Sequence, residues 1–270
     1  MECDSGHVRL PSWLPLKITG DANGWVSPAT MRLDEPAVGS LRDVVTEIFL
    51  ASAEVAGRLL RAPELAVWWT RPSALAEFRT SGLAGHLARA VLNVERYLDT
   101  PVTTGARPLS RPPDAVSYFR PAGGGPGGDD PDNASHDVPD SASAAVRRTI
   151  RERGEQEAAG GPAALADRYD ATRARLAVRL PVLPDDQPVL MFGRCVLPLR
   201  ECLITRLVEL VVHTDDLAVS LGLPTPAFRD DADELVITTL GRIARRRHGT
   251  LPVLRTLARR ERAPAHIAAF

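Results

Sequence analysis

The part of this sequence richest in reactive side chains is one apolar stretch, residues 199–221. At about 100° per residue, a helix over this stretch gathers five polar residues into an arc of about 80°. Because the rest of the circumference is apolar, we expect the helix to be buried and this stripe to face inward or into a cavity. Burying unpaired charges is costly, so these groups must satisfy one another, hold a metal or face water. The stripe consists of Cys202, Arg206, Glu209, His213 and Asp216.

Two members of the stripe have the spacing of metal ligands. Glu209 and His213 stand at i and i+4, so their side chains meet on one helical face and are able to share an ion. A metal site in a helical bundle needs a further ligand from a facing helix. His86, inside the apolar repeat of residues 83–98, is the best candidate, because the other histidines lie in weakly patterned segments or behind a basic run. The alternative is an ordinary contact between Glu209 and His213.

Other charged residues near these ligands are candidates for catalysis. Asp216 lies one turn beyond His213, where it is able to orient a ligand imidazole. Arg206 and Arg89 are candidates for binding a substrate carboxylate. The equally simple alternative is that each arginine is a structural partner of Asp216 or Glu209.

A polar face also accompanies His86 on its own helix. Arg89 and Asn93, at i+3 and i+7 from His86, are the candidates for binding a cosubstrate. Cys202 offers a fourth ligand or a nucleophile, but a buried cysteine more often serves in packing, and we favour packing.

Apolar periodicity predicts the elements that position these residues. A short β-hairpin is expected where residues 189–197 flank a turn at Gly193. Residues 64–77 suit a short packed connection. The predicted helices cover residues 41–62, 83–98, 141–180 with a break at 160–162, 199–221, 230–248 and 252–262.

Domain organisation follows from composition. Residues 1–39 lack sustained periodicity and predict an extended or disordered lead-in, and residues 40–270 predict one helical bundle. Residues of about 101–140 are rich in Pro, Gly and Asp and predict a long flexible loop. Tyr118 lies in this loop, which is either a lid over the site or, as we favour, a disordered spacer.

Composition excludes several classes of protein. The 33 basic and 34 acidic residues nearly cancel, so no global field favours nucleic acid or an anionic membrane as a partner. No run of about 18 apolar residues predicts a membrane span, and the first residues do not resemble a signal peptide. Three cysteines without a C-x-x-C pair do not suggest a disulfide framework. We expect a cytoplasmic protein.

Two strings resemble a known family. Residues 85–88 (GHLA) and 206–218 (RLVELVVHTDDLA) are similar to the mycothiol-dependent maleylpyruvate isomerase family, within the DinB-like superfamily. The resemblance extends over about residues 41–270. It implies a mainly all-α, DinB-like four-helix bundle with a short β-hairpin and extra C-terminal helices. It also implies that His86, Glu209 and His213 hold a divalent metal, usually zinc, and that mycothiol is the cosubstrate.

The function implied is a metal-dependent S-transferase or isomerase that uses a low-molecular-weight thiol and acts on a small electrophile. Residues 77–81 (EFRTS) replace a Trp-containing segment of many members, so we expect a substrate other than maleylpyruvate. The alternative is a non-catalytic module that binds a metal or a small ligand, in which a fourth protein ligand would close the metal site. We expect a monomer or a homodimer.

Overall fold

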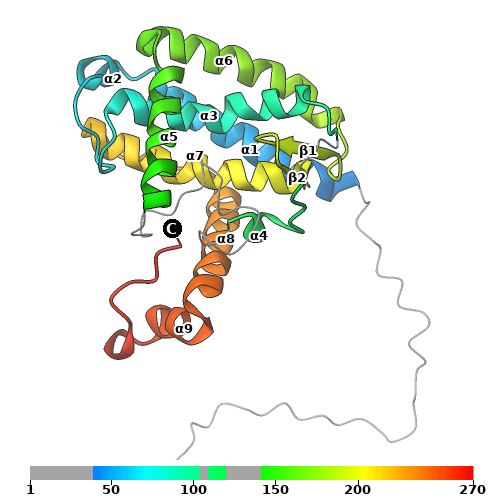
Figure 1. The fold of residues 1–270 in the computed structure, drawn as a ribbon, viewed down its shortest axis with the longest axis vertical. Coiled ribbons are helices and arrows are strands. Elements are labelled where there is room, and N and C mark those ends of the chain that lie inside the picture. Colours follow the sequence, from blue (N-terminus) through cyan, green and yellow to red (C-terminus); the bar gives the residue numbers. More distant parts are fainter. Residues whose placement is uncertain (1–38, 104–108, 120–140, 270) are drawn as a thin grey trace, which may run out of the picture. The chain divides into compact units, whose positions relative to one another are not determined.

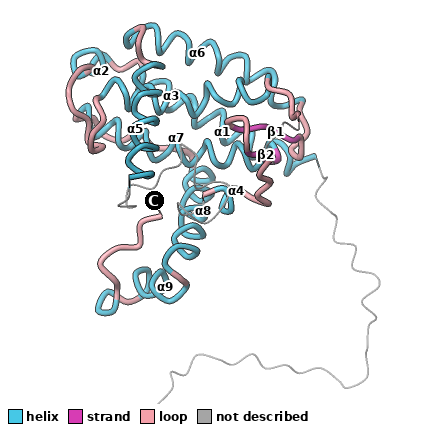
Figure 2. Tube along the Cα trace, in the orientation of Figure 1, coloured by secondary structure: helices cyan, strands magenta, loops and turns pink. Residues whose placement is uncertain are grey.

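A computed structural model describes residues 39–103, 109–119 and 141–269. The described part is mainly helical, and its only strands form one short antiparallel hairpin (Figure 2). None of its helices combines the length and the apolar character that crossing a bilayer requires.

Four long helices form the bundle that carries the candidate site (Figure 1). They are α1 (Gly39–Leu60), α3 (Thr80–Asp99), α6 (Gly161–Arg179) and α7 (Leu199–Leu221). Helices α1 and α3 each pack against both α6 and α7. A fifth helix, α5 (Ser141–Glu157), packs against α3 on the outside of the bundle (Figure 1).

Shorter elements connect and extend the bundle. Helix α4 packs against α7 and α8, and α9 packs against α8. These elements are α2 (Pro63–Trp68), α4 (Ala115–Tyr118), β1 (Pro188–Met191), β2 (Cys195–Pro198), α8 (Asp230–His248), α9 (Thr250–Ala258) and 3₁₀ turns at Leu180–Val182 and Arg260–Arg262.

Most predicted elements are confirmed. Helix α7 has the predicted bounds and ends at Gly222, whose φ of 68° is the left-handed conformation that glycine adopts at helix ends. The hairpin pairs Val189 with Leu197 around the predicted turn. The break expected in the third helix separates α5 from α6 at Gly161, where φ is 87°.

Some expectations differ from the structure or lie outside it. The last predicted helix is divided at Arg259 into α9 and a 3₁₀ turn. Within the expected flexible loop, α4 is a buried helix, so the spacer interpretation is wrong for Tyr118. Residues 1–38, 104–108 and 120–140, which contain most of the lead-in and of the loop, lie outside the described residues.

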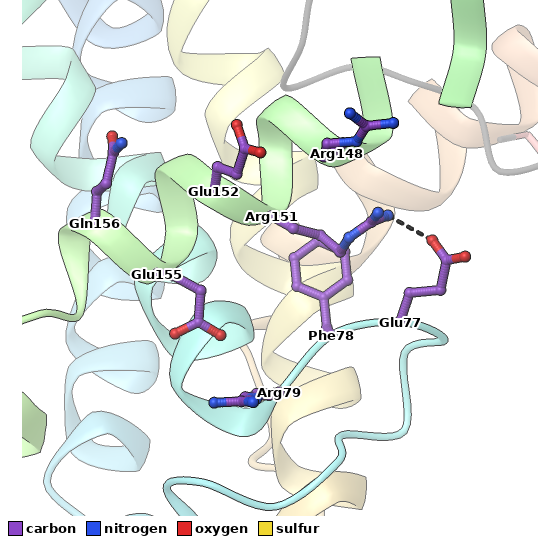
Figure 3. A pocket seen from close by; sticks show the side chains of 8 residues that line it. All are labelled: Glu77, Phe78, Arg79, Arg148, Arg151, Glu152, Glu155 and Gln156. Atoms are coloured by element: carbon purple, nitrogen blue, oxygen red, sulfur yellow. Dashed lines mark hydrogen bonds and ion pairs between the residues drawn. The ribbon is translucent and has the colours of Figure 1, made fainter. Parts of the chain in front are cut away.

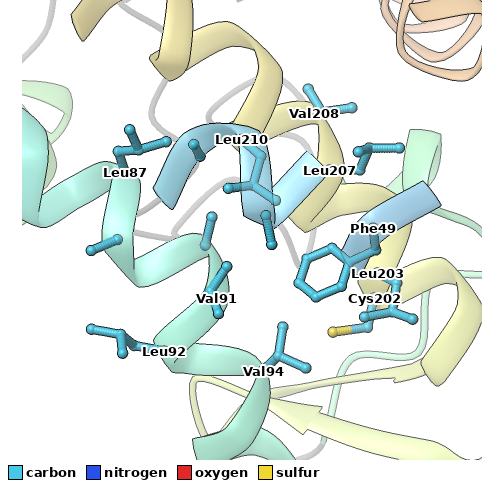
Figure 4. Close-up of a cluster of buried hydrophobic side chains, with 14 of the residues drawn as sticks. Phe49, Leu87, Val91, Leu92, Val94, Cys202, Leu203, Leu207, Val208 and Leu210 are labelled. Atoms are coloured by element: carbon cyan, nitrogen blue, oxygen red, sulfur yellow. The ribbon is translucent and has the colours of Figure 1, made fainter. Parts of the chain in front are cut away.

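The core forms where α1, α3 and α7 meet (Figure 4). Phe49 of α1, Leu87 and Val91 of α3, and Leu203 and Leu207 of α7 are all buried there. Full burial of one such side chain stabilises the fold by roughly 1.5–3 kcal/mol. This packing fixes α3 relative to α7, and therefore His86 relative to Glu209 and His213.

Glycines allow the backbone of α5 to lie directly against α3. A Cβ atom added to Gly85 would lie 2.0 Å from the carbonyl oxygen of Gly154, and one added to Gly154 would lie 2.3 Å from the carbonyl oxygen of Gly82. Real Cβ atoms do not approach backbone atoms so closely. The glycine that precedes His86 is therefore required by helix packing.

We predict that Gly85→Ala destabilises the protein. Alanine is the better helix former by about 1 kcal/mol, but overpacking here should outweigh this gain and cost about 1–3 kcal/mol. Urea denaturation measures the difference. Gly241→Ala in α8 is the matched control, because nothing lies within 4 Å of the added Cβ, and it should be neutral or stabilising. Equal effects of the two substitutions would contradict the close contact between α3 and α5.

Candidate metal centre

Three donor atoms from two facing helices meet inside the bundle. His86 Nε2 of α3 lies 3.1 Å from His213 Nε2 of α7. Glu209 Oε2, one turn before His213, lies 3.1 Å from His213 Nε2 and 3.6 Å from His86 Nε2. The structure thus brings together the three residues that the sequence predicted as ligands.

The geometry and chemistry of these donors fit a single divalent metal. A tetrahedral zinc ion with bonds of about 2.0–2.2 Å holds its ligand atoms about 3.3 Å apart, and the three separations lie on either side of this value. Two imidazoles and a carboxylate are also a ligand set that leaves one position for water or substrate. The side chains of His86, Glu209 and His213 are only 6%, 10% and 12% exposed.

Asp216 holds the outer nitrogen of His213. Its Oδ2 lies 2.8 Å from His213 Nδ1, so a proton on Nδ1 is donated to the carboxylate. In this tautomer the Nε2 lone pair is directed at the point where the three donor atoms meet. This arrangement is typical of metal-binding histidines. Asp216 lies where the sequence predicted an orienting group, and its part in a reaction remains a prediction.

In the metal-free protein, the same atoms stabilise a proton on His213. Burial alone would lower the pKa of His213, but hydrogen bonds and charges of Asp216 and Glu209 raise this pKa to about 9. Burial alone would raise the pKa of Glu209, yet its hydrogen bonds with His213 and His86 and the charge of Arg206 bring it well below its usual range. The proton of His213 therefore supplies the positive charge that the buried carboxylate needs.

Arg206 lies one turn before Glu209 and is fully buried. Its Nε donates to Thr205 Oγ1 at 3.1 Å, and its Nη2 lies 3.4 Å from the Tyr118 hydroxyl of α4. The guanidinium carbon also lies 5.8 Å from the ring centre of Phe192, a distance typical of a cation–π contact. Arg206 thus adds positive charge near Glu209, and binding of a substrate carboxylate by Arg206 remains a prediction.

Arg89 and Asn93 belong to a different charged cluster, centred on Glu157 at the end of α5. Arg89 Nη1 lies 3.5 Å from Glu157 Oε2. Arg96 donates two hydrogen bonds of 2.8 Å to Glu157 and one of 3.0 Å to Asn93 Oδ1. Arg168 of α6 completes the cluster at 2.8 Å from Glu157 Oε1.

The Glu157 cluster corrects one expectation. The structural partner proposed for Arg89 was Asp216 or Glu209, but the structure pairs it with Glu157, which the sequence analysis did not single out. Burial would raise the pKa of Glu157, and the hydrogen bonds and charges of the arginines outweigh this and lower it. The cluster joins α3, α5 and α6, so it holds the bundle together around His86. Cosubstrate binding by Arg89 and Asn93 remains a prediction.

Cys202 takes part in packing. It is a free cysteine in the core drawn in Figure 4, and burial raises the pKa of its thiol to about 12. A thiol with so high a pKa is a poor nucleophile near neutral pH. In the part of the chain that the structure describes, the group of convergent donors contains His86, Glu209 and His213 alone. The packing interpretation is thus the one that its surroundings support.

A pocket that the sequence analysis missed lies beside this centre. Its volume is about 400 Å³, and Phe78, which lines it, also lies against His86 with ring centres 6.0 Å apart. Figure 3 shows the pocket between α5 and the segment that precedes α3, with an ion pair between Arg151 and Glu77. Its residues are Glu77, Phe78, Arg79, Arg148, Arg151, Glu152, Glu155 and Gln156.

The segment that carries Phe78 is tied to α7. The backbone N–H of Ala74 donates to Ser220 Oγ at 2.8 Å, and Ser220 Oγ donates to the backbone oxygen of Asp216 at 2.6 Å. Glu77 has a φ of 67°, which is unusual for a residue other than glycine. The position of Phe78 beside His86 therefore depends on hydrogen bonds between its segment and the distant end of α7. No periodicity in the sequence predicts this position.

Comparison with known proteins assigns the chain to a family. Residues 49–218 match the family described as the mycothiol maleylpyruvate isomerase N-terminal domain. The chain belongs to this family. No curated protein and no solved structure matches the chain significantly.

Membership of the mycothiol maleylpyruvate isomerase N-terminal domain family confirms the resemblance predicted from the sequence. It also agrees with the all-α, DinB-like bundle and its single short hairpin. The matched range contains His86, Glu209, His213 and Asp216, whereas α8 and α9 follow it.

We predict that the purified protein binds about one divalent ion per chain, because three buried donors that face one point need a cation between them. His86→Ala and His213→Ala should each remove this binding, as measured by elemental analysis after loading with zinc. His266→Ala is the control, since His266 is exposed and pairs with His248 instead. Full occupancy in both ligand variants would contradict the site.

We also predict that metal binding strengthens as the pH rises from about 7 to about 9. Below its raised pKa of about 9, His213 carries a proton that the metal must displace. The apparent affinity for the metal should therefore rise about tenfold per pH unit as His213 loses this proton, and it should level off above this pKa. Calorimetry in buffers of different ionisation enthalpy should show release of about one proton near pH 7. No proton release at that pH would contradict this account.

Proposed function

We propose that this chain is a metal-dependent enzyme that uses a low-molecular-weight thiol to modify a small electrophile, as an S-transferase or an isomerase. The metal is zinc and the thiol is mycothiol in this proposal. The observation that carries it is the convergence of His86, Glu209 and His213 on one buried point. Membership of a family named for a mycothiol-dependent isomerase supports the choice of thiol chemistry.

Each residue has a distinct part in the proposed site. His86, Glu209 and His213 would hold the ion, and Asp216 would keep the His213 ring in the orientation that directs Nε2 at it. Phe78 would shield the His86 side of the centre from water. A divalent metal held there would favour the thiolate form of an incoming thiol near neutral pH.

The electrostatics of the centre favour an anionic reactant. Glu209 and Asp216 bring two negative charges, and Arg206 brings one positive charge. With a divalent cation and neutral histidines, the group therefore retains one positive charge, which a thiolate would neutralise. Attack of the thiolate sulfur on an electrophilic carbon, followed by release of the adduct, is a transferase reaction. Addition to a cis alkene, rotation and expulsion of the same thiol is an isomerase reaction.

We predict that Glu209→Gln loses both metal and thiol transfer, because the substitution removes the only charged ligand. Asp216→Asn should retain metal but lose about 10- to 100-fold in rate, since it alters only the partner of His213. Elemental analysis and thiol consumption across a panel of electrophiles measure both effects.

Asp215→Asn is the matched control, because Asp215 is exposed and accepts a hydrogen bond from Thr225 outside the centre. This variant should keep metal and activity. If Glu209→Gln and Asp216→Asn both kept the wild-type rate, the metal would not be catalytic. A non-catalytic module that binds metal would then replace the enzyme.

A further inference from the structure

Helix α9 exposes a row of leucines. The side chains of Leu251, Leu254 and Leu257 are 51%, 57% and 78% exposed, and their spacing of three residues places them along one face of the helix. Val253, about 100° around the helix from the middle of this row, is buried, so the helix has a covered side and an exposed side. An exposed apolar row of this kind indicates a surface that binds something.

Basic residues lie close to these leucines in the sequence. From the end of α8 to the last 3₁₀ turn, residues 245–262 contain seven arginines and a single acidic residue, Glu261. Arg245, Arg255 and Arg260 are exposed and form no ion pair within the described part of the chain. We call the three leucines and the exposed Arg245, Arg255, Arg259 and Arg260 the α9 surface. The other three arginines are left out, because Arg246 donates a hydrogen bond to Ser117 Oγ of α4, Arg247 is half-buried and Arg262 pairs with Glu261.

We propose that the α9 surface binds peripherally to an anionic lipid bilayer. The three leucines would enter the boundary between headgroups and acyl chains, as the apolar face of an interfacial helix does. The arginines would lie at the level of the lipid phosphates, since their long stems let the charged ends reach water. Each basic residue near an anionic leaflet adds to the attraction.

Charge complementarity selects this partner over two others. A two-fold contact with a second copy would place the α9 surface against itself, so that the arginines would repel one another. Nucleic acid would satisfy the arginines through its phosphates but leave the leucines in water. An anionic bilayer satisfies both.

Peripheral binding is compatible with the rest of the molecule. The sequence predicted no membrane partner because the chain lacks a long apolar run and has a net charge of −1. The first property argues against a membrane-spanning helix, and the second argues against attraction of the whole protein to an anionic membrane. Neither bears on the α9 surface, where positive charge is concentrated in one region. The inference is also independent of the metal centre, because α9 follows the family match.

Sedimentation of the full chain with vesicles tests the proposal. Binding is expected to vesicles that mix phosphatidylcholine with phosphatidylglycerol, and not to vesicles of phosphatidylcholine alone. The double variant Leu254→Ser/Leu257→Ser should weaken binding by at least about tenfold, because two apolar side chains no longer enter the bilayer. Arg255→Gln/Arg260→Gln should weaken binding at low salt and reduce its dependence on salt.

Val178→Ser is the control, because Val178 is as exposed as Leu257 but lies on α6. This variant should bind vesicles like the wild type. Circular dichroism should show wild-type folding in every variant, since all the replaced side chains are exposed. Equal binding of the leucine variant, or equal binding to neutral and anionic vesicles, would overturn the proposal. Absence of binding to the anionic vesicles would also overturn it, and a dimer or a nucleic-acid complex that the leucine substitutions abolish would then identify the other occupant.

Discussion

A positive charge between three buried donor atoms is the interaction on which the rest of this structure depends. His86, His213 and Glu209 face one point in an apolar interior, where a lone carboxylate is costly. In the metal-free protein, a proton on His213 supplies this charge. A divalent ion would occupy the same point, so the surroundings that stabilise the proton also prepare the site for a metal. Proton and metal therefore compete for one position.

The fold maintains this convergence through contacts at several distances. The core between α3 and α7 fixes the facing ligands, and the contact at Gly85 lets α5 lie against the helix that carries His86. Asp216 orients His213 directly, and Arg206 adds charge from one turn away. The Glu157 cluster closes the outer side of α3. A change in any of these contacts should therefore disturb the metal centre, because it would displace one of the ligands.

Local sequence patterns were sufficient to predict the ligands and most helices, because both depend on spacing within one element. The stripe on α7 follows from helical geometry, and His86 follows from the need for a facing ligand. The partner of Arg89 was not predictable, since Glu157 lies 68 positions further along the chain and on another helix. Phe78 was missed for a different reason: it lies only eight positions before His86, but in a non-periodic segment that is held by Ser220 of α7.

X-ray absorption at the zinc edge of the metal-loaded protein, without added thiol, tests the central claim most directly. The account predicts only nitrogen and oxygen neighbours at about 2.0–2.2 Å, with outer-shell scattering from two imidazoles. His86 and His213 would supply these rings, and Glu209 a carboxylate oxygen. A sulfur neighbour at about 2.3 Å would place Cys202 or another thiol on the metal. That result, or scattering from fewer than two imidazoles, would contradict the account.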